Sequence, residues 1–266
     1  MKDFELVILK NHFMRVLSAK EGYNKFNDIR MQIPVCFIIA MEAEAKPLIN
    51  ALSLKEDVDF APGLPCRAFT GSFNNNPIAL VLNGKDEQYN LDLIGTQAAT
   101  LTTQLTIDYF HPELIISAGT AGGFQRKGAE FGDVYLSYPN VVFHDRRVDI
   151  PGWKEMGFGG YSVKDIRSIA DELNLKTGVV TTGNSLDMSA QDEAIIEQLN
   201  GEVKEMEAAA IAWVATLHKT PMFCIKAVTD LVDTEHPTQE QFMTNLKLAV
   251  NNLAIKVQEV LIKLLG

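Results

Sequence analysis

Three acidic residues stand where apolar stretches of the sequence end or begin, and their type and placement could serve catalysis. Asp230 closes the apolar stretch "FCIKAVTD", Glu44 follows the apolar stretch "PVCFIIA", and Glu207 opens the apolar stretch "MEAAAIAWVATLHK". For each acid taken alone, a structural role is the simpler explanation. Acids in a first helical turn interact favourably with the helix dipole, and an acid after a strand often caps the next helix.

Three such acids at one rim are harder to explain by structure alone, because uncompensated buried charge is costly. Hydrolysis of a glycosidic bond is a reaction that uses several carboxyl groups and needs no metal. One carboxyl group protonates the leaving group and another activates water, while a third can bind sugar hydroxyls and stabilise the cationic transition state. Asp230 suits the role of the acid, since burial at an apolar strand end raises the pKa of a carboxyl group.

The elements that would position these acids alternate between apolar strands and helices. Strands are predicted at 34–40, 66–73, 77–84, 113–123, 133–145, 177–185 and 221–230, with a glycine turn closing the stretch 113–123. Helices are predicted at 42–52, 91–110, 162–174, 206–219 and 238–265. This alternation predicts a single α/β domain with a mostly parallel sheet covered on both faces. Ligands of such folds bind beyond the carboxyl ends of the strands, where Asp230 lies.

Helical spacing adds a prediction for the first acid. Glu44, Leu48 and Leu52 recur at intervals of four residues, so Glu44 is expected at the buried edge of its helix. Glu42 and Lys46 are expected to face away from that row.

Composition excludes several classes of protein. The 266 residues carry a formal charge of −10, which argues against binding to nucleic acid and makes an anionic lipid surface a poor partner. No apolar run approaches the roughly 20 residues that span a bilayer. The three cysteines form no CxxC and no metal-ligand spacing, which predicts reduced thiols in the cytoplasm. Residues 1–30 are expected to be an appended helix of unknown role, and residues 31–266 the main domain.

Six motifs in order, from about Pro34 to the C-terminus, resemble the 5′-methylthioadenosine/S-adenosylhomocysteine nucleosidases of the nucleoside phosphorylase/hydrolase superfamily. The motifs are "AMEAEAKPL", "SAGTAGGF", "FHDRR", "TTGNSLDMSAQDE", "KEMEAAAIAWVA" and "KAVTDLVD". "FHDRR" and the "GNSLDMSAQDE" portion resemble the plant-type branch. The resemblance implies a three-layer α/β/α domain and a homodimer that acts in methionine salvage. It implies a purine nucleoside as substrate, with no cofactor and no metal.

The resemblance also implies a role for each acid. Asp230 would protonate N7 of adenine so that the base leaves as a neutral purine. Glu44 would activate the attacking water, and Glu207 would hold the ribose hydroxyls together with the backbone of Met206. The other residues implied to bind substrate are Met41, Thr120, Ala121, Gly122, Ser185, Leu186, Asp187 and Phe242. Among them, Met41 belongs to the ribose pocket, 185–187 to the adenine and Phe242 to the 5′-alkylthio group.

Two alternative functions use the same fold. A phosphorylase must hold an incoming anion, usually with arginines and backbone amides, but the motif "MEAE" puts carboxylates where phosphate would enter. Water is therefore the favoured nucleophile. A non-catalytic storage protein is the second alternative, and retention of all three acids argues for an enzyme instead. Leu186 and Asp187 replace an aromatic–aliphatic pair that is typical of the bacterial members. The resemblance to the plant-type branch implies a preference for methylthioadenosine over adenosylhomocysteine, and another purine nucleoside, such as futalosine, stays open as the substrate.

Other motifs suggest rival sites with less support. "AGTAGG" matches neither common nucleotide-binding fingerprint. The sequence "VDTEHPT" contains Asp233, Glu235 and His236, but their spacing fits no standard metal site and a solvated loop is expected. His144 and Asp145 lack a serine in a nucleophile elbow, so His144 is expected to be structural or at a subunit contact.

Overall fold

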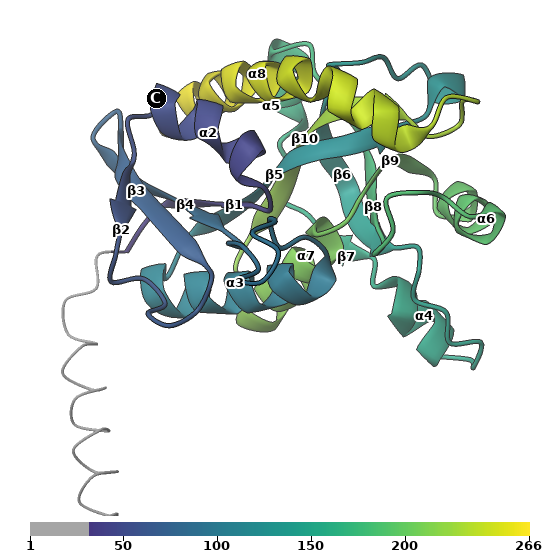
Figure 1. Ribbon diagram of the computed structural model, residues 1–266, viewed down its shortest axis with the longest axis horizontal. Helices are drawn as coiled ribbons and strands as arrows, with labels where there is room; N and C mark the ends of the chain where they lie inside the picture. Colours follow the sequence, from purple (N-terminus) through teal and green to yellow (C-terminus); the bar gives the residue numbers. More distant parts are fainter. Residues whose placement is uncertain (1–31) are drawn as a thin grey trace, which may run out of the picture.

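The computed structural model of the chain describes residues 32–266, in which one mixed sheet carries helices on both of its faces (Figure 1). The appended helix expected for residues 1–30 lies outside the described residues. The strands are β1 Val35–Ile39, β2 Lys55–Asp57, β3 Arg67–Phe73, β4 Asn76–Leu82, β5 Leu114–Gly123, β6 Val134–Phe143, β7 Tyr161–Ser162, β8 Lys176–Thr182, β9 Gly201–Glu205 and β10 Met222–Leu231. The helices are α2 Glu42–Ala51, α3 Thr96–Phe110, α4 Trp153–Phe158, α5 Arg167–Glu172, α6 Ala190–Gln198, α7 Ala208–His218 and α8 Thr238–Leu265, with a 3-10 turn at Gln125–Lys127.

Parallel pairings occupy the centre of the sheet. Strand β1 pairs in parallel with β4 and β5, and β5 pairs in parallel with β10. Strand β8 pairs in parallel with β6 and β9, whereas β10–β6 and β5–β9 are antiparallel. The pairings β5–β10–β6–β8–β9–β5 therefore close into a ring, while β4, β3 and β2 extend the sheet from β1. Because β1, β5 and β10 run in the same direction, their carboxyl ends meet at one edge.

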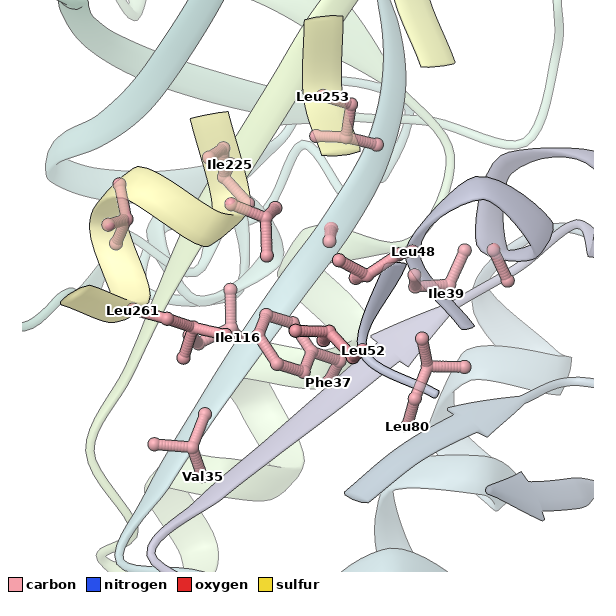
Figure 2. Packing of buried hydrophobic residues seen from close by; sticks show 14 of the residues in the cluster. Val35, Phe37, Ile39, Leu48, Leu52, Leu80, Ile116, Ile225, Leu253 and Leu261 are labelled. Atoms are coloured by element: carbon pink, nitrogen blue, oxygen red, sulfur yellow. The ribbon is translucent and has the colours of Figure 1, made fainter. Parts of the chain in front are cut away.

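The two faces of the sheet follow the alternation of side chains along each strand. In β1, Phe37 points to the layer that contains α2 and α8, whereas Ile38 points to the layer that contains α3 and α7. Figure 2 shows Phe37 and Ile116 of the sheet close to Leu52, which directly follows α2, and to Leu261 of α8. Because the strands are buried on both faces of the sheet, their sequences are continuously apolar. The expected three-layer α/β/α fold with a mixed, mostly parallel sheet is confirmed.

The structure corrects three of the expected element boundaries. The glycine turn expected at the end of 113–123 is wrong, because β5 continues to Gly123 and its glycines pair with β10 and β9. The helix expected from residue 91 begins only at Thr96, since Gly95 has a positive φ of 90° and residues 91–95 form a loop. The helix expected at 162–174 is reduced to α5, preceded by the short strand β7.

Several elements had no counterpart among the predictions. Strands β2 and β9 and helix α6 are short and rich in polar residues, and helix α4 has only six residues, so their apolar periodicity is weak. Helix α6 nevertheless has a sequence signature at its start. The Ser189 hydroxyl accepts a hydrogen bond from the Asp192 amide at 3.1 Å. In turn, Asp192 Oδ2 accepts a hydrogen bond from the Ser189 amide, and the two bonds form a capping box.

Candidate active site

A cavity of about 320 Å³ opens beyond the carboxyl ends of β1, β5 and β10, and all three acids line it. Parallel pairing of these strands explains the meeting of Glu44 and Asp230, because Glu44 follows the end of β1 and Asp230 lies at the end of β10. Glu207 reaches the cavity after β9, which pairs with the end of β5 in the antiparallel direction. The lining residues are Ala40, Met41, Glu44, Leu91, Asp92, Ile94, Thr120, Ala121, Gly122, Leu186, Lys204, Glu205, Met206, Glu207, Thr229, Asp230, Val232 and Phe242.

Glu44 is buried in the first turn of α2 and is held by β5. Its Oε1 accepts hydrogen bonds from the Thr120 amide at 2.8 Å and from the Thr120 hydroxyl at 2.6 Å. Its Oε2 accepts from the Met41 amide at 3.3 Å. Leu48, one turn further along α2, packs into the core and fixes the helix. A carboxyl group that accepts from three donors in this way is oriented as an acceptor at the edge of the cavity.

Asp230 is buried at the end of β10. The register between β10 and β5 shifts between Val228 and Asp230, and such irregularities re-aim side chains next to active sites. The Thr229 hydroxyl donates to Asp230 Oδ1 at 2.8 Å. Burial raises the pKa of Asp230 above its ordinary value, against the opposing effects of this hydrogen bond and of positively charged Lys204. The direction of this shift is the one that a general acid needs.

Gly122 makes room for the Asp230 carboxyl group. A Cβ atom at position 122 would lie 2.6 Å from Asp230 Oδ2 and 2.4 Å from Val232 Cγ1, closer than real Cβ atoms approach. The glycine in β5 is therefore needed for close packing against the acid, and its backbone stays in the strand.

Glu207 is partly buried at the N-cap position of α7. Its Oε1 accepts a hydrogen bond from the Gly95 amide at 2.7 Å, so the start of α3 and the start of α7 meet at this carboxyl group. Burial, followed by the negative charge of Glu205, raises the pKa of Glu207 to about 7. The Glu207 carboxyl group is therefore expected to titrate near neutral pH.

An ion pair beneath the cavity supports the acids. Lys226 Nζ lies 2.9 Å from Glu205 Oε2, and both side chains are only 2% exposed. Glu205 also accepts hydrogen bonds from the amides of Glu207 and Ala208, so the pair fixes the first turn of α7. Lys226 further borders a small polar space behind Glu44 and Glu207.

Most residues implied to bind substrate are brought together by the structure. Those that line the cavity with the acids are Met41, Thr120, Ala121, Gly122, Leu186, Met206 and Phe242. Ser185 and Asp187 do not belong to the lining, and their side chains are exposed. The Ser185 carbonyl oxygen accepts a hydrogen bond from Lys204 Nζ instead. Leu186 lies at the mouth of the cavity.

Sequence reasoning missed Lys204 and Glu205, which line the cavity from β9. This strand has the sequence "GEVKE", whose charges hide the strand pattern. A usable signal was the position of both residues directly before the motif "MEAAAIAW". Leu91, Asp92 and Ile94 were also missed, because the helix predicted at 91–110 includes them, whereas in the structure they belong to the loop before α3.

The rival motifs take structural positions. Asp233 accepts hydrogen bonds from the amides of Gln125 and Arg126 and so caps the 3-10 turn. His144 is buried, and burial, followed by the charge of Lys204, lowers its pKa to about 4. Within residues 32–266, no cluster of three or more His, Cys, Asp or Glu is arranged to hold a metal ion. No helix in that range combines the length and apolar character needed to cross a membrane.

Comparisons with known proteins identify the family to which the chain belongs. A family model described as "Phosphorylase superfamily" matches residues 34–262. The chain belongs to the phosphorylase superfamily. This membership confirms the family expected from the six motifs, since the match spans all of them.

Two plant members of the superfamily are similar to the chain over most of its length. A 5′-methylthioadenosine nucleosidase of Arabidopsis thaliana is 45% identical over 228 residues, which cover 84% of this chain and 85% of that protein. A 5′-methylthioadenosine/S-adenosylhomocysteine nucleosidase of the same plant is 44% identical over 214 residues, covering 80% and 84%. The apo structure of the Arabidopsis 5′-methylthioadenosine nucleosidase matches with a TM-score of 0.86 and 43% identity, covering 89% of this chain and 98% of that one. These relatives confirm the plant-type nucleosidase family.

Proposed function

We propose that this protein is a nucleosidase that hydrolyses the N9–C1′ bond of 5′-methylthioadenosine to adenine and 5-methylthioribose. The observation that carries the proposal is the convergence of Glu44, Glu207 and Asp230 on one cavity. The similarity to plant methylthioadenosine nucleosidases supports the choice of substrate.

Asp230 acts as the general acid. As the N9–C1′ bond breaks, its electron pair moves into the purine, and Asp230 donates a proton to N7 so that adenine leaves neutral. The raised pKa of the buried carboxyl group supports this role, because a general acid must hold its proton at the working pH.

Glu44 acts as the general base for water. The attacking oxygen forms the new bond to C1′, and Glu44 accepts the proton that this oxygen loses. Three hydrogen bonds to Glu44 from Thr120 and Met41 support the role, since they fix the carboxyl group before substrate arrives. Glu207 binds the ribose hydroxyls and stabilises positive charge on the ribose.

The cavity is matched to a small, uncharged nucleoside. Its volume of about 320 Å³ lies at the lower end of the range for small-molecule sites. Leu91, Ile94, Val232 and Phe242 give it apolar lining in addition to the acids. Apolar side chains of this kind suit a 5′-methylthio group better than a charged 5′ substituent.

Charge in the cavity favours water over phosphate as the nucleophile. The lining contains the carboxyl groups of Glu44, Asp92, Glu205, Glu207 and Asp230, whereas Lys204 is the single cationic residue among the described lining residues. Lys204 Nζ is already engaged with two backbone carbonyl groups. A phosphorylase would need free cations at this place.

A direct assay separates the two reactions. The protein is incubated with 5′-methylthioadenosine in phosphate-free buffer and in phosphate buffer, and the products are separated by chromatography. We expect adenine and free 5-methylthioribose at equal rates in both buffers. Release of adenine only with phosphate, together with a sugar 1-phosphate, would reassign the protein as a phosphorylase. S-adenosylhomocysteine and inosine in parallel reactions define the substrate range.

The proposal includes a homodimer. Trp213 and Leu217 lie one turn apart on α7 and are 41% and 63% exposed, and Leu101 on α3 is 41% exposed. Helices α3 and α7 form one outer layer of the molecule (Figure 1), and exposed apolar groups on such a layer mark contact surfaces. Light scattering after size-exclusion chromatography is expected to give twice the chain mass, and Trp213→Glu to shift it towards the monomer. A monomeric wild-type protein would end this part of the proposal.

The proposal also includes a cytoplasmic location and a nucleosidase domain at residues 31–266. Cys36, Cys66 and Cys224 are free and buried, as in proteins from reducing compartments. The match of the family model to residues 34–262 supports the domain boundary. Cell fractionation tests the location, and activity of the fragment 31–266 tests the boundary.

A further inference from the structure

Lys204 is a buried lysine whose side chain lines the cavity from β9. Its strand lies between β8 and β5, and Lys204 is paired with Thr181 on one side and with Gly122 on the other. Only 4% of the residue is exposed. A buried lysine is costly unless its ammonium group is paired, so its contacts indicate what it is used for.

The ammonium group of Lys204 holds the backbone of the loop 183–189 between β8 and α6. Nζ donates to the carbonyl oxygen of Ser185 at 2.5 Å and to that of Leu186 at 3.1 Å. The side chains of Ser185 and Leu186 are exposed, and Leu186 also borders the cavity mouth. The two carbonyl contacts therefore fix the loop at the place where it borders the cavity.

Two other residues hold the ends of the same loop. At its start, the Asn184 amide and side chain both donate to Asp145 Oδ2, and Asn184 Oδ1 accepts from Thr96. At its end, Ser189 caps α6. Lys204 thus supplies the contact in the middle of the loop, on the side that faces the cavity.

We propose that Lys204 is a positioning residue for the purine base, which holds the 185–186 backbone against the side of the cavity where Asp230 meets the leaving group. The inference rests on the proposed function, because the base lies next to the 185–186 backbone only if Asp230 is the residue that protonates it. Lys204 and Asp230 line one cavity and pair with the same residue of β5, Gly122, from its two sides, so the segment that Lys204 holds lies at the Asp230 end of the cavity.

The charge of Lys204 also acts on the acid. The titratable groups that interact electrostatically with it are Asp187, Asp192, Glu205, Asp230 and His144. Burial lowers the pKa of Lys204, while the four carboxyl groups oppose this. In return, the positive charge of Lys204 lowers the pKa of Asp230 and so offsets part of the increase that burial causes. Loss of the lysine charge is therefore expected to raise the pKa of Asp230 further, so that Asp230 stays protonated to higher pH.

The test uses the full chain with Lys204→Met and the matched control Lys127→Met. Lys127 Nζ also donates to a backbone carbonyl, that of Gly201 at 2.7 Å in the same strand, but it does not line the cavity. Adenine binding is measured by calorimetry and 5-methylthioribose by product inhibition. We expect Lys204→Met to weaken adenine binding about tenfold or more, as for loss of hydrogen bonds from a charged group, with thioribose inhibition unchanged. Lys127→Met is expected to leave both unchanged.

The pH profile gives a second readout. Activity is expected to fall at high pH as Asp230 loses its proton, and Lys204→Met should move this fall to higher pH. Lys204→Gln removes the charge but keeps a donor, so it should show the same pH shift with a smaller loss of adenine affinity. This variant also carries the test if the methionine variant fails to fold, as judged by circular dichroism.

The outcomes separate this inference from the proposed function. Wild-type protein that releases no adenine from methylthioadenosine overturns both. Wild-type activity together with a folded Lys204 variant of unchanged adenine affinity overturns the positioning role alone. Equal weakening of adenine and thioribose would also overturn it, since that result describes general disruption.

Discussion

Lys226 Nζ lies 2.9 Å from Glu205 Oε2 in the interior of the protein, directly beneath the cavity that contains the three acids. Lys226 comes from the middle of β10 and Glu205 from the end of β9, strands that are not neighbours in the sheet. The pair thus bridges two parts of the ring of strands. Glu205 in turn accepts hydrogen bonds from the first amides of α7, which place Glu207.

Lys226→Met is expected to lower the free energy of unfolding by about 3–5 kcal/mol, because Glu205 would be left as an uncompensated buried charge. Chemical denaturation measures the change. The double variant Lys226→Met with Glu205→Gln should recover part of the loss, since no unpaired charge remains. Lys263→Met, which breaks an exposed pair with Glu172, should cost at most about 1 kcal/mol. A loss as small in Lys226→Met as in Lys263→Met would contradict the role of the buried pair.

Asp230→Asn is expected to lower kcat at least about 100-fold with little change in KM, because the amide cannot donate an acidic proton to the base. Adenine release from methylthioadenosine, followed by chromatography, measures the effect. Asp233→Asn provides a control three residues along, since Asp233 caps a turn and does not line the cavity. Near wild-type kcat in Asp230→Asn would remove Asp230 from the mechanism.

Gly122→Ala is expected to reduce kcat by displacing the Asp230 carboxyl group, because the added Cβ would lie 2.6 Å from Asp230 Oδ2. Gly123→Ala is the matched control. Its Cβ would lie 2.6 Å from Ala129 Cβ and would crowd the core without touching Asp230. Both variants should lose stability by about 1–3 kcal/mol from overpacking, but only Gly122→Ala should lose activity in its folded form. Equal kcat values for the two folded variants would speak against this reading.

The contribution of Glu207 to the stability of the protein is expected to fall as pH rises from about 4.5 to about 7. Burial and the charge of Glu205 raise the pKa of Glu207 in the folded protein to about 7, from an ordinary value of 4.5. In this window the folded state binds more protons than the unfolded state, so unfolding becomes easier as the proton is lost. The stabilisation is fully present below pH 4.5 and absent well above pH 7.

Unfolding midpoints across pH 4–8 for wild type and Glu207→Gln check this expectation. The glutamine cannot titrate, so the difference between the two proteins should change across the window and become constant outside it. A difference that stays constant from pH 4 to 8 would show that Glu207 has an ordinary pKa.

Much of the fold follows from local patterns in the sequence. The stretches around Phe37, Ile116 and Ile225 are apolar on both faces, which requires strands covered on both sides. Helix α8 was predicted with its observed limits because its amphipathic pattern is long and its start follows Pro237. Short polar elements such as β9 escaped prediction because strand pairing, and not their own composition, holds them in the sheet.

The sequence by itself determined the order of the long apolar strands and of the longer helices, the acidic residues at their ends and the family to which the chain belongs. These properties depend on residue type and on short periods along the chain. Only the tertiary structure decided that Glu44, Glu207 and Asp230 share one cavity, that Lys204 holds the neighbouring loop, and that Lys226 pairs with Glu205. The physical reason is that such contacts join residues far apart in sequence, and their energies depend on burial and distance, which arise only when the sheet closes.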